Sequence, residues 1–321
     1  MLLSVCQDRF KIYPFSDVPH CWRELHSAAS CLNALSIIHF QHEQAPAEPL
    51  KILDAIKRLD EASIISGVTN LGIDSNFASH INDLQKILRK APQPTFISSA
   101  FELCQQRTSV VQERDLFPSS HRFATEAWKR PFIVRGAAKD WPAVKGHAHD
   151  DTRHPSSQWR CWANGEYLHS QAGPGRVVPV EVGADYTKEG WSQGLMPFAM
   201  FLRRAGWSFK RSPWDTAANQ AEPERDMNKL TSVRSPENDT RPVYLAQFDL
   251  LRMIPELAKD VQTPELAWSV MPTPDWRPDY KGPAEPVQNV WFGPPQMTSP
   301  AHTDPYYNLY SECRIECNLQ C

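Results

Sequence analysis

The chain has 321 residues, 41% of them hydrophobic, with a formal net charge of -3 and an isoelectric point of about 6.4. This length and apolar content allow about two domains with buried cores. The slightly acidic balance provides no overall positive field, so we expect no direct nucleic-acid binding. No apolar run approaches the roughly 20 residues that span a bilayer, so no membrane association is expected either.

The amino terminus and the cysteines bear on the cellular compartment. Asp8 and Arg9 come too early in the chain for the apolar centre of a signal peptide. Eight cysteines without a secretory signal are typical of reduced thiols. We therefore expect an intracellular protein of the nucleus, the cytoplasm or both.

Residues 1–115 have the spacing of amphipathic helices. Asp74 and Ser75 are candidate N-caps, and residues 91–94 are expected to break the helical pattern. Such apolar stripes most often pack against other helices, so we predict a small all-helical domain over residues 1–115. The stripes are Trp22, Leu25, Ala29 and Leu32, then Leu50, Leu53, Ile56 and Leu59, then Phe77, Ile81, Leu84 and Leu88.

The pattern turns to β within residues 116–321. Segments 131–135 and 177–182 are rich in β-branched residues, which favours strands. Residues 203–242 are polar, mixed in charge and interrupted by prolines. Because such a segment buries too little apolar surface to offset its ordering entropy, we predict a disordered insertion between a helix at 196–202 and a strand containing Tyr244.

A second polar stretch, residues 145–174, holds a cluster of histidines and aspartates. Metal binding by the cluster is one interpretation, but a solvated loop is favoured because no predicted strand or helix fixes the ligands. Trp159 and Trp162 indicate that part of this loop docks on the domain. The cluster consists of His147, His149, Asp150, Asp151 and His154.

The residues most indicative of chemistry are His302 and Asp304. In an extended segment, side chains at i and i+2 point to the same side, so this imidazole and carboxylate can reach one metal ion together. They would provide two of the three ligands of a 2-His-1-carboxylate triad, which leaves open positions on non-haem Fe(II). No histidine follows His302 in these 321 residues, so a third ligand of that kind cannot come from residues 305–321.

The segments that surround this motif are more specific than the motif itself. Together, in their order along the chain, they resemble the JmjC oxygenases, in the branch of lysine demethylase 8 and Jumonji-domain protein 5. The resemblance covers about residues 116–309. The segments are 131–137 (PFIVRGA), 141–142 (WP), 178–183 (VPVEVG) with 191–193 (WSQ), 244–247 (YLAQ) and 289–308 (NVWFGPPQMTSPAHTDPYYN).

This resemblance implies an Fe(II)- and 2-oxoglutarate-dependent dioxygenase on a double-stranded β-helix, the cupin-like jelly roll. The fold class is then α+β, with the helical domain 1–115 followed by a partial JmjC domain over residues 116–321. The resemblance further implies a protein substrate, such as a histone or another basic protein, that is hydroxylated or demethylated. Residue by residue, it makes His302 and Asp304 iron ligands, and it places Tyr244, Ser299, Asn308 and Trp291 at the 2-oxoglutarate.

Two groups that the family would supply have no counterpart here: a distal histidine, and the lysine that pairs with the far carboxylate of 2-oxoglutarate. Residues 310–321 change character abruptly, so we expect the domain to be incomplete at its carboxy-terminal end and the polypeptide as written to be inactive. Cys313, Cys317 and Cys321 would share one face of a helix and could bind zinc, but they lack the paired spacing of structural zinc sites.

Two other functions remain open from the sequence. One is a catalytically inert form that acts as a binding or regulatory protein through its helical amino-terminal domain. The other is a cupin-like metal protein of different chemistry, because this fold carries several functions. The segment 244–247 and the residues before His302 favour the JmjC interpretation, because they match positions that contact the co-substrate.

Overall fold

The computed structural model describes residues 2–14, 17–42, 49–67, 74–89, 111–145, 162–207, 209, 240–273, 277–294, 297–300 and 302–312. The predicted break at 91–94, the histidine cluster at 147–154, most of the predicted insertion at 203–242 and the cysteines at 313–321 lie outside them. None of the described helices is long and apolar enough to cross a bilayer.

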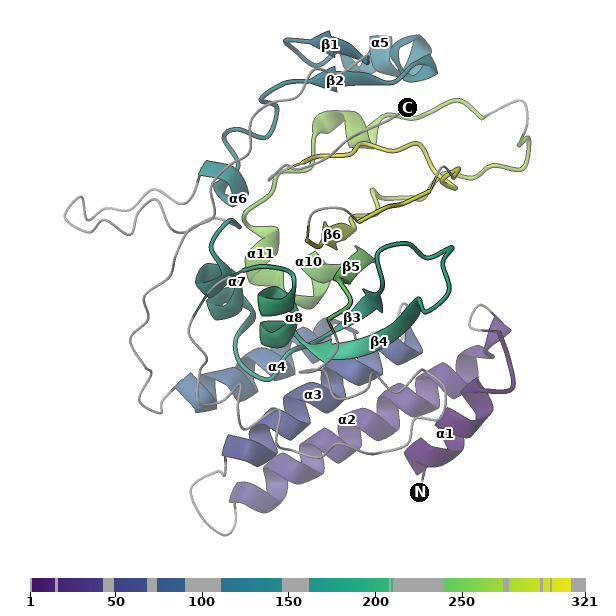
Figure 1. Ribbon diagram of the computed structural model, residues 1–321. Coiled ribbons are helices and arrows are strands. Elements are labelled where there is room, and N and C mark those ends of the chain that lie inside the picture. Colours follow the sequence, from purple (N-terminus) through teal and green to yellow (C-terminus); the bar gives the residue numbers. More distant parts are fainter. Residues whose placement is uncertain are drawn as a thin grey trace, which may run out of the picture.

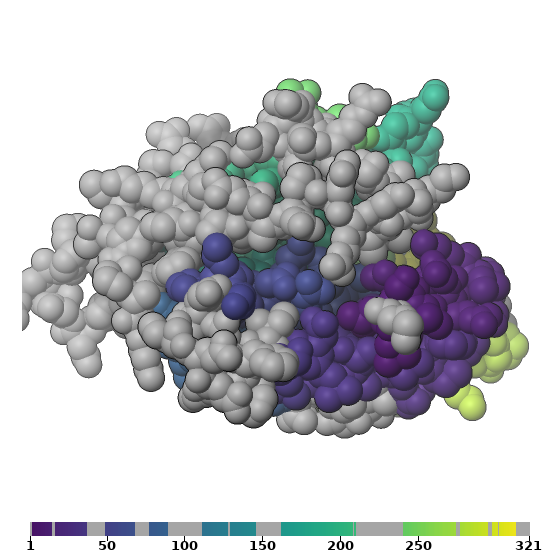
Figure 2. Space-filling model, turned by 90° about the horizontal axis from the view of Figure 1, so that it is seen from below, coloured from purple at the N-terminus to yellow at the C-terminus, as the bar shows by residue number. Residues whose placement is uncertain are grey.

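The amino-terminal part is a layer of helices, coloured purple to blue in Figure 1. It consists of α1 (Leu2–Phe10), α2 (His20–His42), α3 (Pro49–Ser66) and α4 (Asp74–Arg89). Helix α3 packs between α2 and α4 and contributes the centre of their shared core. Figure 2, which views the molecule from below, shows α1 and α2 forming a continuous part of the surface.

The predicted apolar stripes are confirmed for most positions. Phe77, Ile81, Leu84 and Leu88 are all buried on α4, as are Leu53, Ile56 and Leu59 on α3 and Ala29 on α2. The prediction is wrong for Leu32 and Leu50, which are 66% and 52% exposed. These two positions continue the apolar spacing of their helices beyond the part that a neighbouring helix covers. Asp74 is the first residue of α4 and so lies inside the helix.

The second part is built on a four-stranded antiparallel sheet of β3 (Val177–Val182), β4 (Ser192–Pro197), β5 (Val243–Phe248) and β6 (Val290–Phe292), in the order β4-β3-β5-β6. The predicted strand 177–182 is confirmed. The helix predicted from residue 196 begins at Phe198 instead, as α8 (Phe198–Arg204), because residues 196 and 197 complete β4. Pro197 occupies the N-cap position, where its missing N–H costs no helical hydrogen bond.

Helices cover one face of this sheet. The core side chains of β3 and β5, such as Val180 and Leu245, pack with α7 (Gly165–Ala172), α8, α10 (Leu250–Met253) and α11 (Pro255–Ala258). The prediction of a solvated loop over 145–174 is wrong for its second half, where α7 forms. Asn164 caps that helix by accepting hydrogen bonds from the N–H groups of Glu166 and Tyr167.

The predicted docking of Trp162 is confirmed, since it is 7% exposed, whereas Trp159 lies outside the described residues. Its indole Nε1 donates to Asp260 Oδ2 at 2.9 Å, and the Tyr167 hydroxyl donates to the same carboxylate at 2.9 Å. Asp260 is itself buried, so the three side chains satisfy one another inside the core. This network joins the start of α7 to the turn after α11.

A smaller layer lies at the other end of the molecule (Figure 1). Here β1 (Gln112–Arg114) pairs in parallel with β2 (Phe132–Val134) beside α5 (Ser120–Thr125) and η2 (Ala127–Lys129). The remaining short elements are α6 (Pro142–Lys145) and η4 (Glu265–Trp268). Leu309 packs against the cluster of Phe123, Ala127 and Leu266 in this layer. The layer thereby anchors the end of the segment that carries His302 and Asp304.

An ion pair with almost no exposure joins the helical layer to the sheet. Arg176, just before β3, donates from Nε and Nη2 to the two oxygens of Asp60 on α3, at 2.8 and 2.9 Å. Asp60 also accepts the N–H of Val177, and Arg176 donates to the Met253 carbonyl at 2.6 Å. Burial raises the pKa of the Asp60 carboxyl, and the guanidinium opposes that rise.

The turn between α7 and β3 fits into the same junction. Gln85 of α4 donates from Nε2 to the Ala172 carbonyl at 2.7 Å. Gly173 has a φ of 76°, and a Cβ there would collide with the Gln85 side chain. The helical layer therefore fixes the chain immediately before β3, the strand on which the rest of the sheet is built.

Candidate functional site

The side chains of His302 and Asp304 lie next to each other on an irregular turn. His302 Nε2 is 3.6 Å from Asp304 Oδ1, and the two side chains are 53% and 38% exposed. Residues 302–304 belong to no strand. The turn nevertheless brings the imidazole and the carboxylate together, as their i and i+2 positions predict.

Each of these two side chains is held by a hydrogen bond through the polar atom that does not face the other side chain. The Pro300 carbonyl, 2.8 Å from His302 Nδ1, can only accept, so Nδ1 donates this hydrogen bond and Nε2 is the ring nitrogen that faces Asp304. Asn308 Nδ2 donates to Asp304 Oδ2 at 3.0 Å, which leaves Oδ1 free of that bond. Metal-binding histidines and carboxylates are commonly oriented in this way.

These two donors fit adjacent positions on one metal ion. Ligand atoms at roughly 2.1 Å from an octahedral ion, at right angles, lie about 3 Å apart, so a small side-chain rotation would close the 3.6 Å separation. Imidazole with carboxylate is a donor pair that non-haem iron accepts. Among the residues that the structure describes, no group of three metal-binding side chains occurs, so a third donor is not identified there.

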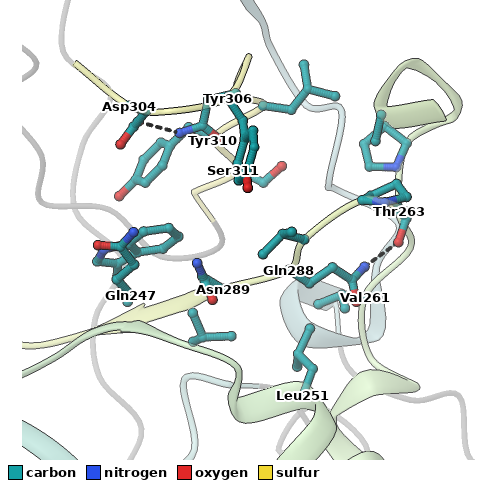
Figure 3. Close-up of a pocket in the computed structure, with 18 of the residues that line it drawn as sticks. Gln247, Leu251, Val261, Thr263, Gln288, Asn289, Asp304, Tyr306, Tyr310 and Ser311 are labelled. Atoms are coloured by element: carbon teal, nitrogen blue, oxygen red, sulfur yellow. Dashed lines mark hydrogen bonds between the residues drawn. The ribbon is translucent and has the colours of Figure 1, made fainter. Parts of the chain in front are cut away.

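Asp304 opens onto a cavity of about 1040 Å³. Its walls come from β5, β6, the segment 261–271 and the residues after Asp304. Figure 3 shows Gln247 and Asn289 on the strand side of this cavity, with Asp304, Tyr306 and Tyr310 across from them. A cavity of this size, with an aromatic wall and few charged groups, has the dimensions of a small-molecule site.

The structure brings together three of the four predicted co-substrate residues. Tyr244, Trp291 and Asn308 all line the cavity, on β5, on β6 and beside Asp304. Ser299 is exposed and is not among the lining residues, and neither is His302. The segment that carries Ser299 is attached to the sheet, because Thr298 donates its N–H to the Ala184 carbonyl at 2.9 Å.

Two features of the cavity wall were not foreseen from the sequence. Gln247 has a φ of 50°, beside the register shift in the pairing of β5 with β6. Positive φ is unfavourable for a residue with a side chain, and bulges of this kind often turn a side chain toward a site. Gly293 lies against the Tyr244 ring so closely that any Cβ would collide with it. Neither the bulge nor this contact leaves a clear signal in one sequence.

Three of the stretches that carry the family resemblance meet on the sheet. Trp191 Nε1 donates to Glu181 Oε2 at 3.4 Å, and Glu181 is the cross-strand partner of Tyr244. Burial raises the pKa of the Glu181 carboxyl, while the hydrogen bonds from Trp191 and Gln193 oppose that rise. The motifs 178–183, 191–193 and 244–247 are therefore parts of one surface.

The comparison with known families agrees with this geometry. The model of the cupin-like domain matches residues 122–314, which is more than half of the chain. The chain belongs to the cupin-like family, in its JmjC group. The predicted α+β class with a cupin-like domain is thereby confirmed. That the domain is incomplete after Leu309, and that it begins near residue 116, stay predictions.

Relatives include lysine-specific demethylase 8 of Danio rerio, which is 24% identical over 97% of this chain and 65% of its own length. Jumonji C domain-containing protein 5 of Drosophila melanogaster is 25% identical over 92% of the chain and 60% of its own length. Lysine-specific demethylase JMJ30 of Arabidopsis thaliana is 30% identical over 57% of the chain and 30% of its own length. The chain thus spans less than two thirds of the length of these relatives.

Proposed function

We propose that this protein is an Fe(II)- and 2-oxoglutarate-dependent dioxygenase that oxidises a side chain of a protein substrate. The observation that carries the proposal is the pair of His302 Nε2 and Asp304 Oδ1, 3.6 Å apart and each oriented through its other atom. Family membership supports it, and two of the relatives named above are called lysine-specific demethylases.

The role of each side chain follows from its contacts. When bound, iron with 2-oxoglutarate and O2 would supply the oxidising chemistry. His302 holds its proton on Nδ1 and presents Nε2 to the metal, and Asp304 presents Oδ1. Tyr244 and Trp291 form the wall beside the co-substrate. Asn308 has a second N–H besides the one that it gives to Asp304, so it can orient the ligand and contact the co-substrate together.

The substrate that we propose is a histone or another basic protein. The charged residues that line the cavity support this choice, since Glu285, Asp304 and Glu312 are acidic and Arg204 is the single cation among the described lining residues. Oxidation at an N-methyl carbon would demethylate the side chain, and oxidation at another carbon would leave a stable alcohol. We propose the nucleus or the cytoplasm as the compartment, which fits relatives named as lysine demethylases.

Metal binding tests the proposal without requiring turnover. Mn²⁺ can replace Fe(II) in such sites and is read by its electron paramagnetic resonance signal. We expect the 321-residue polypeptide to bind Mn²⁺ weakly, more tightly with 2-oxoglutarate present, and His302→Ala to lose this binding. His121→Ala, at an exposed histidine of α5, is the matched control and should bind as the wild type does. Equal binding by His302→Ala would contradict the proposal.

A second candidate function is binding without catalysis, through the helical layer. The observation that favours it is the absence of a three-donor metal group from the described residues, together with the exposure of Ile12 and Leu32 on the helical layer. This second candidate predicts that the polypeptide of these 321 residues turns over no 2-oxoglutarate above background. Iron-dependent succinate formation that disappears in His302→Ala would contradict this second candidate.

A further inference from the structure

The turn that carries the two metal-binding side chains has no regular structure to hold it. In the described part of the chain, residues 302–312 belong to no strand or helix. Its ligands are also exposed, so burial does not fix their rotamers. Asn308 holds the Asp304 side chain by a hydrogen bond, and contacts from a distant segment hold the backbone of the turn.

That segment contributes Pro272, Arg277 and Tyr280, which lie some thirty residues earlier in the chain. Arg277 Nη1 donates to the Pro305 carbonyl at 3.2 Å. The Tyr307 hydroxyl donates to the Pro272 carbonyl at 3.0 Å. These two hydrogen bonds run in opposite directions between the same two segments, and they engage Pro305 and Tyr307, on either side of Tyr306.

Aromatic contacts complete the attachment. The Tyr280 ring centroid is 5.8 Å from that of Tyr307 and 6.4 Å from that of Tyr306, both in edge-to-face arrangement. The guanidinium carbon of Arg277 lies 5.9 Å from the Tyr280 centroid, which is within cation–π range. Arg277 therefore touches both the carbonyl beside the ligand and the ring that packs on the turn.

The position of Pro305 explains how such a contact reaches the metal site. Pro305 directly follows Asp304, its ring fixes its own φ, and it restricts the preceding residue to extended conformations. Holding the Pro305 carbonyl thus holds the backbone of Asp304, whose side chain is already held by Asn308. Building on the proposed function, we propose that Arg277 is a positioning residue that orients Asp304 for metal binding.

The test measures Mn²⁺ affinity and thermal stability of the 321-residue polypeptide in parallel. Arg277→Ala should weaken Mn²⁺ binding about tenfold, the lower end of the effect of removing a group that orients a ligand. Arg277→Lys should recover part of the affinity, because an ammonium can still donate to the Pro305 carbonyl. The melting temperature should stay unchanged, since the contacts of Arg277 are exposed.

Two further variants make the result decisive. Arg252→Ala removes an exposed arginine that pairs with Asp249 away from the turn, and should bind Mn²⁺ as the wild type does. Tyr307→Phe removes the hydroxyl that binds Pro272 while keeping the ring, and should weaken binding several-fold even if Arg277→Ala fails to fold.

The outcomes separate this inference from the proposed function. If the wild type binds Mn²⁺ but Arg277→Ala and Tyr307→Phe bind it equally well, the positioning role is wrong and the metal site stands. If the variants only lower the melting temperature and leave the affinity unchanged, Arg277 is merely structural and the inference is again wrong. If the wild type binds no Mn²⁺, the proposed function fails and the positioning role with it.

Discussion

The ion pair of Asp60 with Arg176 and the pair that His302 forms with Asp304 lie in opposite environments. The side chains of the first pair are 0% and 5% exposed and make two short hydrogen bonds. Those of the second are 53% and 38% exposed and stand 3.6 Å apart. A buried charge without a partner is very costly, so removal of either member of the first pair should destabilise the fold. The second pair is exposed, contributes little to stability and is available to a ligand.

The two regions are connected through the sheet. The junction of Asp60 and Arg176 fixes the start of β3, and β3 pairs with β5, which carries Tyr244. The turn that carries His302 and Asp304 lies on the other side of the cavity and is attached through contacts such as that of Arg277 with Pro305. Substitutions in the junction should therefore unfold the protein, and substitutions in the turn should change ligand binding alone.

The largest effect is expected from Asp60→Ala. It leaves the buried guanidinium of Arg176 without its carboxylate, which should lower the free energy of unfolding by about 3–5 kcal/mol. Asp54→Ala is the matched control on the same helix, because Asp54 pairs with Arg58 at 2.8 Å but both side chains are partly exposed. That change should cost at most about 1 kcal/mol. Urea denaturation measures both values, and similar losses would break the contrast between buried and exposed pairs.

The next largest effect is expected on the stability of the fold at acidic pH, where a buried histidine should behave differently from an exposed one. His26 is 3% exposed and lies 2.8 Å from the Ser66 hydroxyl, and burial lowers its pKa from 6.5 to about 4. Because the pKa of the folded state is the lower one, this histidine stabilises the fold fully above pH 6.5. That stabilisation, about 3 kcal/mol, is lost as the pH falls from 6.5 toward 4.

Urea denaturation above pH 6.5 and near pH 4 measures this loss. His26→Gln should lose less stability over the same range, because glutamine does not titrate. His20→Gln, at an exposed histidine of α2 that pairs with Glu24, should keep the wild-type dependence. If wild type and His26→Gln lost stability in parallel, carboxylates alone would account for the acid sensitivity.

The features that the sequence predicted depend on residues close together in the chain, and the features that it missed depend on residues far apart in the chain. The stripe from Phe77 to Leu88 and the strand 177–182 are local periodicities, and both are found as predicted. The cavity wall at Tyr244 and Trp291 was reached through the family motifs. The pairing of Asp60 with Arg176 joins residues 116 positions apart, and that of Arg277 with Pro305 joins two loops. Neither pairing produces a pattern of nearby residues in the sequence, so only the folded structure reveals these two contacts.

Helix α7 shows a different limit of sequence reasoning. Its segment is polar enough to indicate a loop, yet Asn164 provides an N-cap and Trp162, Tyr167 and Leu168 are buried. The burial depends on Asp260, which lies 93 positions after Tyr167. The Asp260 carboxylate accepts hydrogen bonds from the Tyr167 hydroxyl and from the Trp162 indole. Tertiary contacts of this kind override a weak local preference.

The smallest effect is expected at Tyr244, where the two regions meet. Its backbone belongs to the sheet that the junction fixes, and its ring lies on Gly293 at the cavity wall. Tyr244→Phe keeps the ring and its packing, so stability should change by less than about 1 kcal/mol. If the hydroxyl binds a carboxylate of 2-oxoglutarate, its loss removes a hydrogen bond to a charged group, worth roughly 1.5–3 kcal/mol.

The dissociation constant of 2-oxoglutarate for the Mn²⁺-loaded polypeptide should then rise by about ten- to a hundredfold, while Mn²⁺ affinity without co-substrate stays the same. Isothermal titration of 2-oxoglutarate measures the change. Tyr186→Phe is the matched control, because Tyr186 is 44% exposed and lies outside the cavity lining. An unchanged dissociation constant in Tyr244→Phe would make this residue a packing tyrosine of the sheet, whose ring lies against Gly293 in the cavity wall. In that case the binding of the co-substrate would depend on the turn that carries His302 and Asp304, and the sheet would contribute only the shape of the cavity.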